Sequence, residues 1–278
     1  IAYANDRTQG RGPRAKRGEM SRIIEHADIR RTIMKMRAAT CAARAICLVT
    51  ARELDIAERA GTKEEREAAH MRAALLTPVA KAYSTDIGVE VASLGVQVHG
   101  GMGYVEETGA AQYYRDARIL PIYEGTNGIQ AIDLVTRKLP LGDGAVAASL
   151  IEELAETVEE VRASNRPEFG RMAERLGEAV DALKRASLWL GEQMQDNPEA
   201  ALAGATPYLR LFGLTAGGVY LARGALLAAR DNGGAAGARV TLARFWAETE
   251  VALAPGIAAQ ITEGADGVLA MPIERLSA

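Results

Sequence analysis

The chain has 278 residues, of which 48% are hydrophobic and 25% are charged, and its formal net charge is −3. This composition is typical of a soluble globular protein with one large core or two smaller ones. It excludes a disordered chain, because the charges are too evenly balanced and the aliphatic content is too high. No stretch approaches the roughly 18 to 20 uninterrupted apolar residues of a membrane helix, and the best candidate, 211–229, is interrupted by Arg223 and by glycines.

The two cysteines, Cys41 and Cys47, are too few for a disulfide scaffold. On a helix they lie on different faces, so we expect both to be reduced and buried in a cytoplasmic protein. The opening residues turn polar within the first few positions, and no signal peptide is predicted. Because the first residue is not Met, we expect the chain to be a fragment of a longer protein.

Basic residues gather near the start of the chain, whereas the second half is acidic. Neither half reaches the strongly basic balance of nucleic-acid-binding proteins, so no nucleic-acid partner is expected. The densest basic stretch, 7–22, suits a single anionic ligand better than a polynucleotide. A solvated basic loop explains that stretch equally well.

The residue pattern predicts helices almost throughout. Residues 19–60 contain no Gly or Pro, and their apolar residues recur at helical spacing, which predicts one long helix of about 35 residues. A second helical region is expected over 63–98, kinked or split at Pro78 and ended by the glycines at 100–101.

A turn-rich stretch up to 125 and a helix over 127–139 complete the first predicted domain, residues 1–140. Two glycines and a proline in 140–144 break any helix there. We therefore place a domain boundary at about 140–145, followed by a second domain, 145–278.

The second domain shows apolar residues spaced by three and four positions, the mark of amphipathic helices. Short breaks between them favour an antiparallel, up-and-down bundle. Alternating β-branched runs are absent, so an all-α fold is expected. The four predicted helices cover about 146–161, 172–196, 205–230 and 238–262.

Three blocks in 97–126 carry the chemical signal. They read Gln-Val-His-Gly-Gly-Met-Gly-Tyr at 97–104, Arg-Asp-Ala-Arg-Ile at 115–119 and Ile-Tyr-Glu-Gly-Thr at 122–126. A helix that ends in glycines exposes backbone N–H groups and suits an anion or a flat cofactor. Glu124 lies in an apolar loop, where burial would raise its pKa and make it a usable base.

In this order and spacing, the blocks resemble the C-terminal part of the acyl-CoA dehydrogenases, flavin enzymes that desaturate acyl-CoA thioesters. The opening Tyr3-Ala4-x-x-Arg7-x-Gln9 is similar to the family's start of this helical domain. The resemblance covers 1–140. Residues 145–278 resemble the additional helical domain of the long bacterial branch, as in broad fatty acyl-CoA and 3-methylmercaptopropionyl-CoA dehydrogenases.

The resemblance implies that Glu124 is the catalytic base, which removes the α-proton while a hydride leaves the β-carbon for FAD. Its backbone N–H and a flavin hydroxyl would bind the thioester carbonyl oxygen, each contributing about 3 to 4 kcal/mol. By the same resemblance, Arg7 and Gln9 contact the pyrophosphate of a neighbouring subunit's FAD. Gln97 and Gly101 contact its ADP part.

Thr126 matches a further FAD contact. Two positions depart from the family: Gly10 replaces a bulky aromatic residue, and Gly128 replaces a long polar one. The resemblance also implies an acyl-CoA substrate, electron-transfer flavoprotein as acceptor and a homo-oligomer, because the FAD sites straddle subunits. The family's N-terminal helical domain and middle β-domain are not in this sequence, so the isolated chain is expected to bind FAD weakly and to be inactive.

Two alternative functions remain, an acyl-CoA oxidase that uses oxygen and a non-catalytic helical interaction module. No metal site is predicted, because the Glu-x-x-His motif at 67–70 indicates a di-iron bundle only when a second copy exists. Arg115, Asp116 and Arg118 are interpreted as a structural ion network, and His99 as a structural hydrogen-bonding residue.

Overall fold

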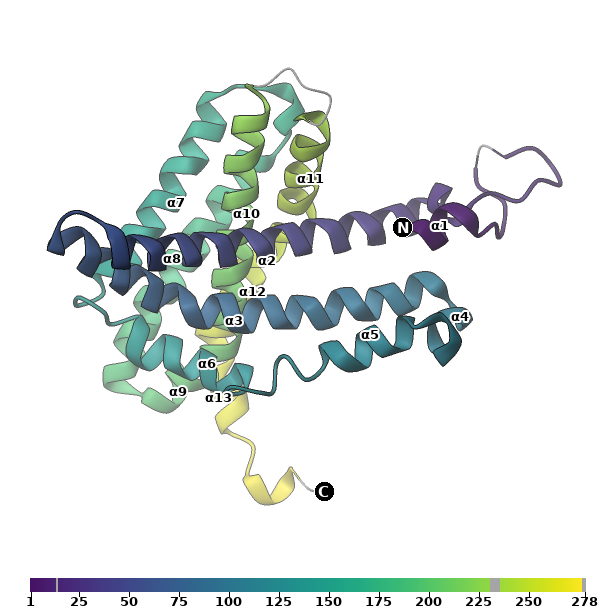
Figure 1. Ribbon diagram of the computed structural model, residues 1–278. Helices are drawn as coiled ribbons and strands as arrows, with labels where there is room; N and C mark the ends of the chain where they lie inside the picture. The colour runs from purple at the N-terminus through teal and green to yellow at the C-terminus, as the bar shows by residue number, and fades with distance from the viewer. Residues whose placement is uncertain (14, 231–235, 277–278) are drawn as a thin grey trace.

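The computed structural model of the protein describes residues 1–13, 15–230 and 236–276. Over these ranges the chain is helical and has no β-strand, and its one β-type contact is an isolated antiparallel bridge between Thr8 and Arg22. The predicted all-α class is confirmed (Figure 1).

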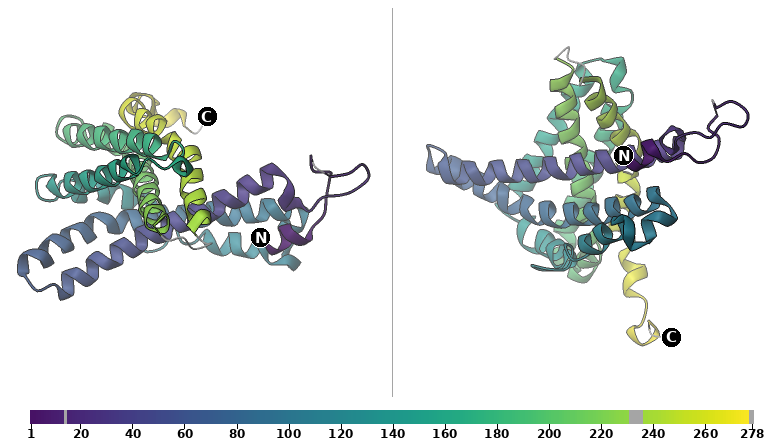
Figure 2. Two further views of the ribbon diagram at one scale, coloured as in Figure 1. Left: turned by 90° about the horizontal axis from the view of Figure 1, so that it is seen from above. Right: turned by 45° about the vertical axis from the view of Figure 1, so that its right-hand side comes forward.

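The first part of the chain is dominated by two long antiparallel helices. Both views of Figure 2 show α2 and α3 running side by side, with their ends extending beyond the other helices. The helices of this part are α1 (Ala2–Asp6), α2 (Ala27–Arg59), α3 (Lys63–His99), α4 (Gly101–Tyr104), α5 (Ala110–Ala117) and α6 (Asn127–Asp133), which continues into a π-helical turn over Leu134–Lys138.

The second part packs several helices across the middle of the α2–α3 pair (Figure 1). The predicted helix over 238–262 is wrong as a single element. It is two helices, because the chain turns over Val251–Leu253 and restarts with a proline in the first turn of the next helix. The helices are α7 (Ala145–Ala163), α8 (Met172–Asp196), α9 (Pro198–Ala203), α10 (Ala205–Ala228), α11 (Ala236–Thr249), α12 (Ala254–Glu263) and α13 (Ala265–Leu269).

α2 begins at Ala27, well inside the stretch 19–60 that lacks Gly and Pro, and its 33 residues agree with the predicted length of about 35. Residues before it are held in a different way: the Ser21 N–H donates to the Gly10 carbonyl at 2.9 Å, and the Gln9 N–H donates to the Ser21 carbonyl at 3.0 Å. This backbone pairing folds the segment back along the basic loop, so it cannot form helical hydrogen bonds as well.

α3 begins at a capping box in which Thr62 accepts from the Glu65 N–H and Glu65 accepts from the Thr62 N–H. The Thr62 hydroxyl, which donates to the Glu65 carboxylate at 2.9 Å, and then the Thr62 N–H lower the pKa of Glu65. The helix then runs without interruption to His99 through the buried Pro78. Of the two predicted outcomes at Pro78, a kink or a split, the split is therefore excluded.

α10 lies at the centre of the fold and is the helix most enclosed by its neighbours. It is long and apolar enough to pass a composition test for a membrane helix, with a mean hydropathy of 1.4, although no such stretch was expected from the sequence. However, 78% of that apolar window is buried inside the fold, as expected of a helix in a protein core.

One continuous core joins the two parts of the chain. Buried residues of α2 and α3, such as Ile46 and Leu76, belong to the same cluster as Leu150 and Leu183 from α7 and α8. The segment before α7 contains three consecutive residues with positive φ, Gly142 to Gly144, which form a tight turn. The domain boundary at 140–145 stays a prediction.

A partly buried ion network reinforces this joint. The Arg72 guanidinium of α3 lies 2.5 Å from a Glu153 carboxylate oxygen of α7, and Arg223 of α10 lies 3.1 Å from the other oxygen. Glu53 of α2 is buried and lies 3.9 Å from Arg72. Four helices thus share one set of charges.

The two cysteines are free, as expected. Their predicted burial is wrong, because Cys47 is exposed and Cys41 is only half-buried. The Cys47 thiol lies 3.4 Å from the Ser84 hydroxyl of α3.

Candidate active site and cofactor-binding end

Glu124 lies in a tight turn between α5 and α6. Its φ is +52°, and that of the next residue, Gly125, is +86°. For a non-glycine residue this left-handed conformation costs about 1 to 2 kcal/mol, and such residues are concentrated at functional sites. The residue that the sequence singled out as a base therefore has an unusual backbone that its neighbours must hold.

Contacts from α3 and α6 hold this turn. The Lys81 ammonium of α3 donates to the Gly125 carbonyl at 2.7 Å and to the Asn127 side-chain oxygen at 2.9 Å. The Gln130 amide donates to the Glu124 carbonyl at 3.4 Å. Thr126 caps α6 by accepting from the Ile129 N–H.

The side chain of Glu124 is exposed. Its neighbours Ile122 and Tyr123 are also 46% and 48% exposed. The apolar enclosure expected around Glu124 is therefore not provided by this chain, and that expectation is corrected.

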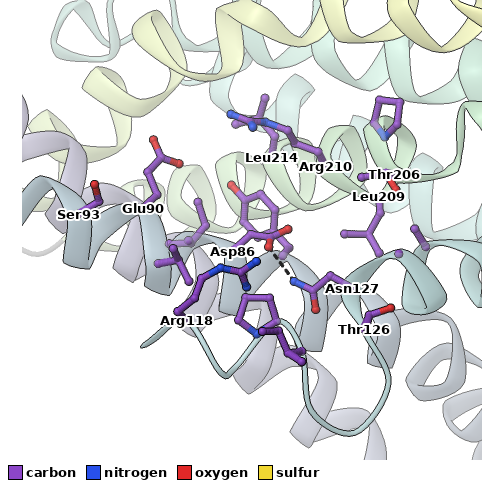
Figure 3. A pocket seen from close by; sticks show the side chains of 18 of the residues that line it. Asp86, Glu90, Ser93, Arg118, Thr126, Asn127, Thr206, Leu209, Arg210 and Leu214 are labelled. Carbon is purple, nitrogen blue, oxygen red and sulfur yellow. Dashed lines mark hydrogen bonds between the residues drawn. The ribbon is translucent and has the colours of Figure 1, made fainter. Parts of the chain in front are cut away.

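A cleft of about 850 Å³ opens beside the turn, between α3, the α5–α6 segment and α10. Figure 3 shows Asp86 hydrogen-bonded to Asn127, with Arg118 and Arg210 directed into the same space. Burial raises the pKa of Asp86, although the Asn127 hydrogen bond and the nearby Arg210 oppose this shift. Thr126 lines the cleft, whereas Glu124 is not among its lining residues.

Glycines form the far end of α3. The Gly100 N–H donates to the Gln97 carbonyl at 3.0 Å, and Gly100 has a φ of +61°. A Cβ atom added at Gly100 or Gly101 would meet nothing within 4 Å, whereas one at Gly103 would lie 2.2 Å from the Val96 carbonyl oxygen. Gly103 is thus required for packing, and the backbone at 100–101 is open to a ligand.

His99 connects this end of α3 to α1. Its ring stacks on Tyr3 at a centroid distance of 4.4 Å, and its Nδ1 lies 2.7 Å from the Gly95 carbonyl oxygen. The Tyr3 hydroxyl donates to the His99 carbonyl at 3.3 Å. The predicted structural role of His99 is confirmed.

Arg7 and Gln9 follow α1 and have exposed side chains on a backbone that is fixed on both sides. The Arg7 carbonyl accepts from the Ile23 N–H at 2.8 Å, and the Gln9 carbonyl lies 2.8 Å from His26 Nε2. Gly10 has a φ of +69° beside the His26 ring. A φ of this sign favours glycine at position 10.

The predicted site residues form two groups. Arg7, Gln9, Gln97 and Gly101 belong to the outer end of α3, whereas Glu124 and Thr126 lie beside its middle. From Lys81 to Gln97 the helix rises about 24 Å. One chain therefore does not bring the six residues into a single pocket.

Lys81, Asp86 and Asn127, which hold the turn, were not predicted from the sequence. A polar stripe on α3 at positions 81, 85 and 86 was the available signal. The predicted ion network of Arg115, Asp116 and Arg118 is wrong: Arg115 pairs with Glu106 at 3.1 Å, and within the described ranges no ion pair joins the three to one another. Over those same ranges, no group of three or more His, Cys, Asp and Glu could hold a metal ion.

Comparison with known proteins identifies the family. The acyl-CoA dehydrogenase C-terminal domain model matches residues 1–139, and the acetyl-CoA dehydrogenase C-terminal-like model matches residues 150–272. The chain belongs to the acyl-CoA dehydrogenase family, and the resemblance drawn from the sequence is confirmed.

Among individual relatives, 3-methylmercaptopropionyl-CoA dehydrogenase of Ruegeria pomeroyi is 40% identical over 274 residues, 97% of this chain and 46% of the relative. A butyryl-CoA dehydrogenase of Syntrophomonas wolfei is 32% identical over 57% of this chain and 26% of its own length. A caffeyl-CoA reductase-Etf complex subunit of Acetobacterium woodii is 44% identical over 52 residues, 19% of this chain and 14% of the subunit. The chain spans less than half the length of each.

The solved structure of Caenorhabditis elegans ACDH-11 in complex with C11-CoA resembles the chain with a TM-score of 0.72 and 19% identity. The match covers 96% of this chain and 42% of that one. At this identity the similarity supports the fold, and the family assignment rests on the sequence matches.

Proposed function

We propose that the chain is part of an FAD-dependent acyl-CoA dehydrogenase, which introduces an α,β double bond into an acyl-CoA thioester. The observation that carries the proposal is the left-handed turn at Glu124, within the family's Ile-Tyr-Glu-Gly-Thr block and tied to α3 through Lys81. Family membership provides the chemical class. The whole protein's activity is proposed, because the chain spans less than half of its relatives.

In this mechanism the Glu124 carboxylate accepts the proton from the carbon next to the thioester carbonyl. The Glu124 N–H donates to the carbonyl oxygen as negative charge develops there, which stabilises the transition state. FAD, when bound, accepts the hydride that leaves the β-carbon. The apolar side chains of Ile122 and Tyr123 exclude water once a further surface covers them.

The outer end of α3 fits the cofactor. A Cβ atom added at Gly100 or Gly101 would meet no other atom within 4 Å. The exposed side chains of Arg7 and Gln9 follow α1, and the Tyr3–His99 stack joins α1 to α3. A guanidinium is a suitable partner for a pyrophosphate, and backbone without a side chain beside it lets such a ligand approach closely. Because this end lies about 24 Å from the turn, we propose that it holds the FAD of a neighbouring subunit in a homo-oligomer.

Electron-transfer flavoprotein is the proposed electron acceptor. The similarity to a subunit of a reductase–Etf complex supports this choice.

The isolated 278-residue chain should show no turnover, because we propose that FAD also needs surfaces from outside this chain. A titration of the isolated chain with FAD, followed by flavin fluorescence, should show weak binding or none; tight stoichiometric binding would contradict the proposed need for further domains.

The decisive test is Glu124→Gln in the full-length, FAD-loaded protein. Loss of the general base should lower the rate of flavin reduction by an acyl-CoA by about 10³-fold, with FAD content unchanged. Glu107→Gln, an exposed glutamate of the same region, is the matched control and should keep the rate. A near-normal rate in Glu124→Gln would show that another residue is the base.

A further inference from the structure

The turn that carries Glu124 is anchored to α3 by a side chain that the sequence pattern did not mark. Lys81 is half-buried, and its ammonium donates to the carbonyl of Gly125, the residue directly after Glu124. At 2.7 Å this is a charge-assisted hydrogen bond, stronger than one between neutral groups. Its acceptor belongs to the second of two consecutive residues with positive φ.

Asn127 extends this anchor along α3. Its side-chain oxygen accepts from Lys81 at 2.9 Å, while its amide nitrogen donates to the Asp86 carboxylate at 2.7 Å and to the Ala82 carbonyl at 3.0 Å. Since a cation lies on one side and acceptors lie on the other, the orientation of the amide is determined. Asn127 is also the first residue of α6, so both the Gly125 carbonyl and the start of α6 are fixed to α3.

The geometry points to Lys81 as a positioning residue, which, with Asn127, holds the backbone of the Glu124 turn in the left-handed conformation that presents the carboxylate to substrate. The inference rests on the proposed function. A left-handed glutamate is unfavourable by itself and persists only where its surroundings determine it. Without the Lys81 contact the Gly125 carbonyl can rotate, and the carboxylate then moves relative to the α-carbon of the substrate.

The test compares Lys81→Met with Lys63→Met in the full-length, FAD-loaded protein. Lys63 is on the same helix in an exposed ion pair with Glu67, so its loss should change nothing. Lys81→Met should lower the rate of flavin reduction by about 30-fold, the effect expected of a misplacement below about 1 Å. Acyl-CoA binding is measured in Glu124→Gln with and without Lys81→Met, because Glu124→Gln prevents turnover. The dissociation constant should change less than about threefold, because misplacing the base affects the transition state more than the bound substrate.

Two further readouts separate positioning from general stability. Amide hydrogen exchange of residues 122–126 should become faster in Lys81→Met, while that of α10 and the melting temperature stay as in the parent. Lys81→Arg, which retains a donor, should recover most of the lost rate. If Lys81→Met loses FAD or unfolds, Asn127→Ala provides the same comparison with a smaller loss of about tenfold.

An unchanged rate and exchange in both Lys81→Met and Asn127→Ala would overturn the inference, as would a rate loss that lost FAD content explains in both variants. Failure of the proposed function is distinguishable. If Glu124→Gln keeps its rate, the base is wrong; if Glu124→Gln is slow and Lys81→Met is not, the base stands and only the positioning role fails.

Discussion

Glycines serve opposite purposes at the crossing, where α2 and α3 pack against α10, and at the outer end, formed by α1, α4 and the last turn of α3. At the crossing, a Cβ on Gly213 would lie 2.3 Å from the Tyr83 ring, and one on Gly217 would lie 2.9 Å from Ala42. At the outer end, a Cβ on Gly101 would meet nothing within 4 Å. Absence of a side chain allows close helix packing in one place and leaves backbone accessible in the other.

Charged groups differ between the same two regions. At the crossing, Arg72 and Arg223 both pair with Glu153 in a partly buried network. At the outer end, Arg7 is exposed, and the backbone around it is held by hydrogen bonds between main-chain groups. The charged groups of the crossing thus have partners within the chain, whereas the Arg7 guanidinium at the outer end is exposed.

The largest effect is expected for Gly213→Ala at the crossing. The added methyl group would overlap the Tyr83 ring and force α10 away from α3, which should lower the free energy of unfolding by about 3 kcal/mol. Gly224→Ala on the same helix is the control, because nothing lies within 4 Å, and it should be neutral or slightly stabilising. Urea unfolding measures both; equal effects would refute close packing at Gly213.

Glu153→Gln tests the ion network through pH. Burial alone would raise the pKa of Glu153, but the hydrogen bonds and charges of Arg72 and Arg223 outweigh it and lower that pKa. The resulting stability is present above the unfolded-state pKa and is lost as pH falls through the folded-state value. The variant should lose about 1 kcal/mol at neutral pH and depend less on pH below about 4.5.

Urea unfolding at several pH values checks this prediction. Glu159→Gln, which removes a surface pair with Arg162, is the control and should leave the acid dependence almost unchanged. An acid dependence in Glu153→Gln that equals that of the parent would show that the network does not contribute to joining the two parts.

Thr215→Val should stabilise the crossing by a comparable or smaller amount. Thr215 is fully buried in α10, and its hydroxyl has no hydrogen-bond partner. Valine has the same shape without the unpaired hydroxyl, so stability should rise by about 1 kcal/mol. Thr157→Val is the matched control: its hydroxyl accepts from Arg223 at 2.9 Å, and it should destabilise. Calorimetric melting distinguishes the two signs.

The smallest effect on stability is expected for Gly101→Ala at the outer end. With open space around the new methyl group, the free energy of unfolding should change by less than about 0.5 kcal/mol. In the full-length protein the same methyl group should weaken FAD binding several-fold, measured by flavin release during dilution. A large loss of stability with unchanged FAD affinity would reverse the assignment of the outer end as a ligand surface.

Local sequence signals predicted the elements whose boundaries depend on local interactions. The apolar spacing placed α7 and α8 within a few residues, and the capping pair at Thr62 agrees with the predicted start of α3. The start of α2 could not be predicted in this way, because the pairing of Ser21 with Gly10 decides it. The short α5, in a segment predicted to be turns, was also missed.

In the candidate site, too, features marked by local sequence were predicted and features set by distant contacts were not. The motif identified Glu124, and the glycines identified the open end at Gly101. The anchor at Lys81 escaped notice, because its partners Gly125 and Asn127 lie more than forty residues further along the chain. The polar residues of α3 at 81, 85 and 86 mark a polar face, but the sequence does not show which distant turn contacts that face. The roles of the predicted site residues stay predictions until the variants are measured.

The uninterrupted α3 acts as a ruler between the two groups of predicted site residues. The stretch from Lys81 to Gln97 sets the separation of the two groups. A single inserted residue would rotate one end of the helix by about 100° relative to the other and lengthen the helix by about 1.5 Å. Insertions and deletions among descendants of this chain should therefore accumulate in its loops and spare this stretch, even at positions whose side chains contact nothing.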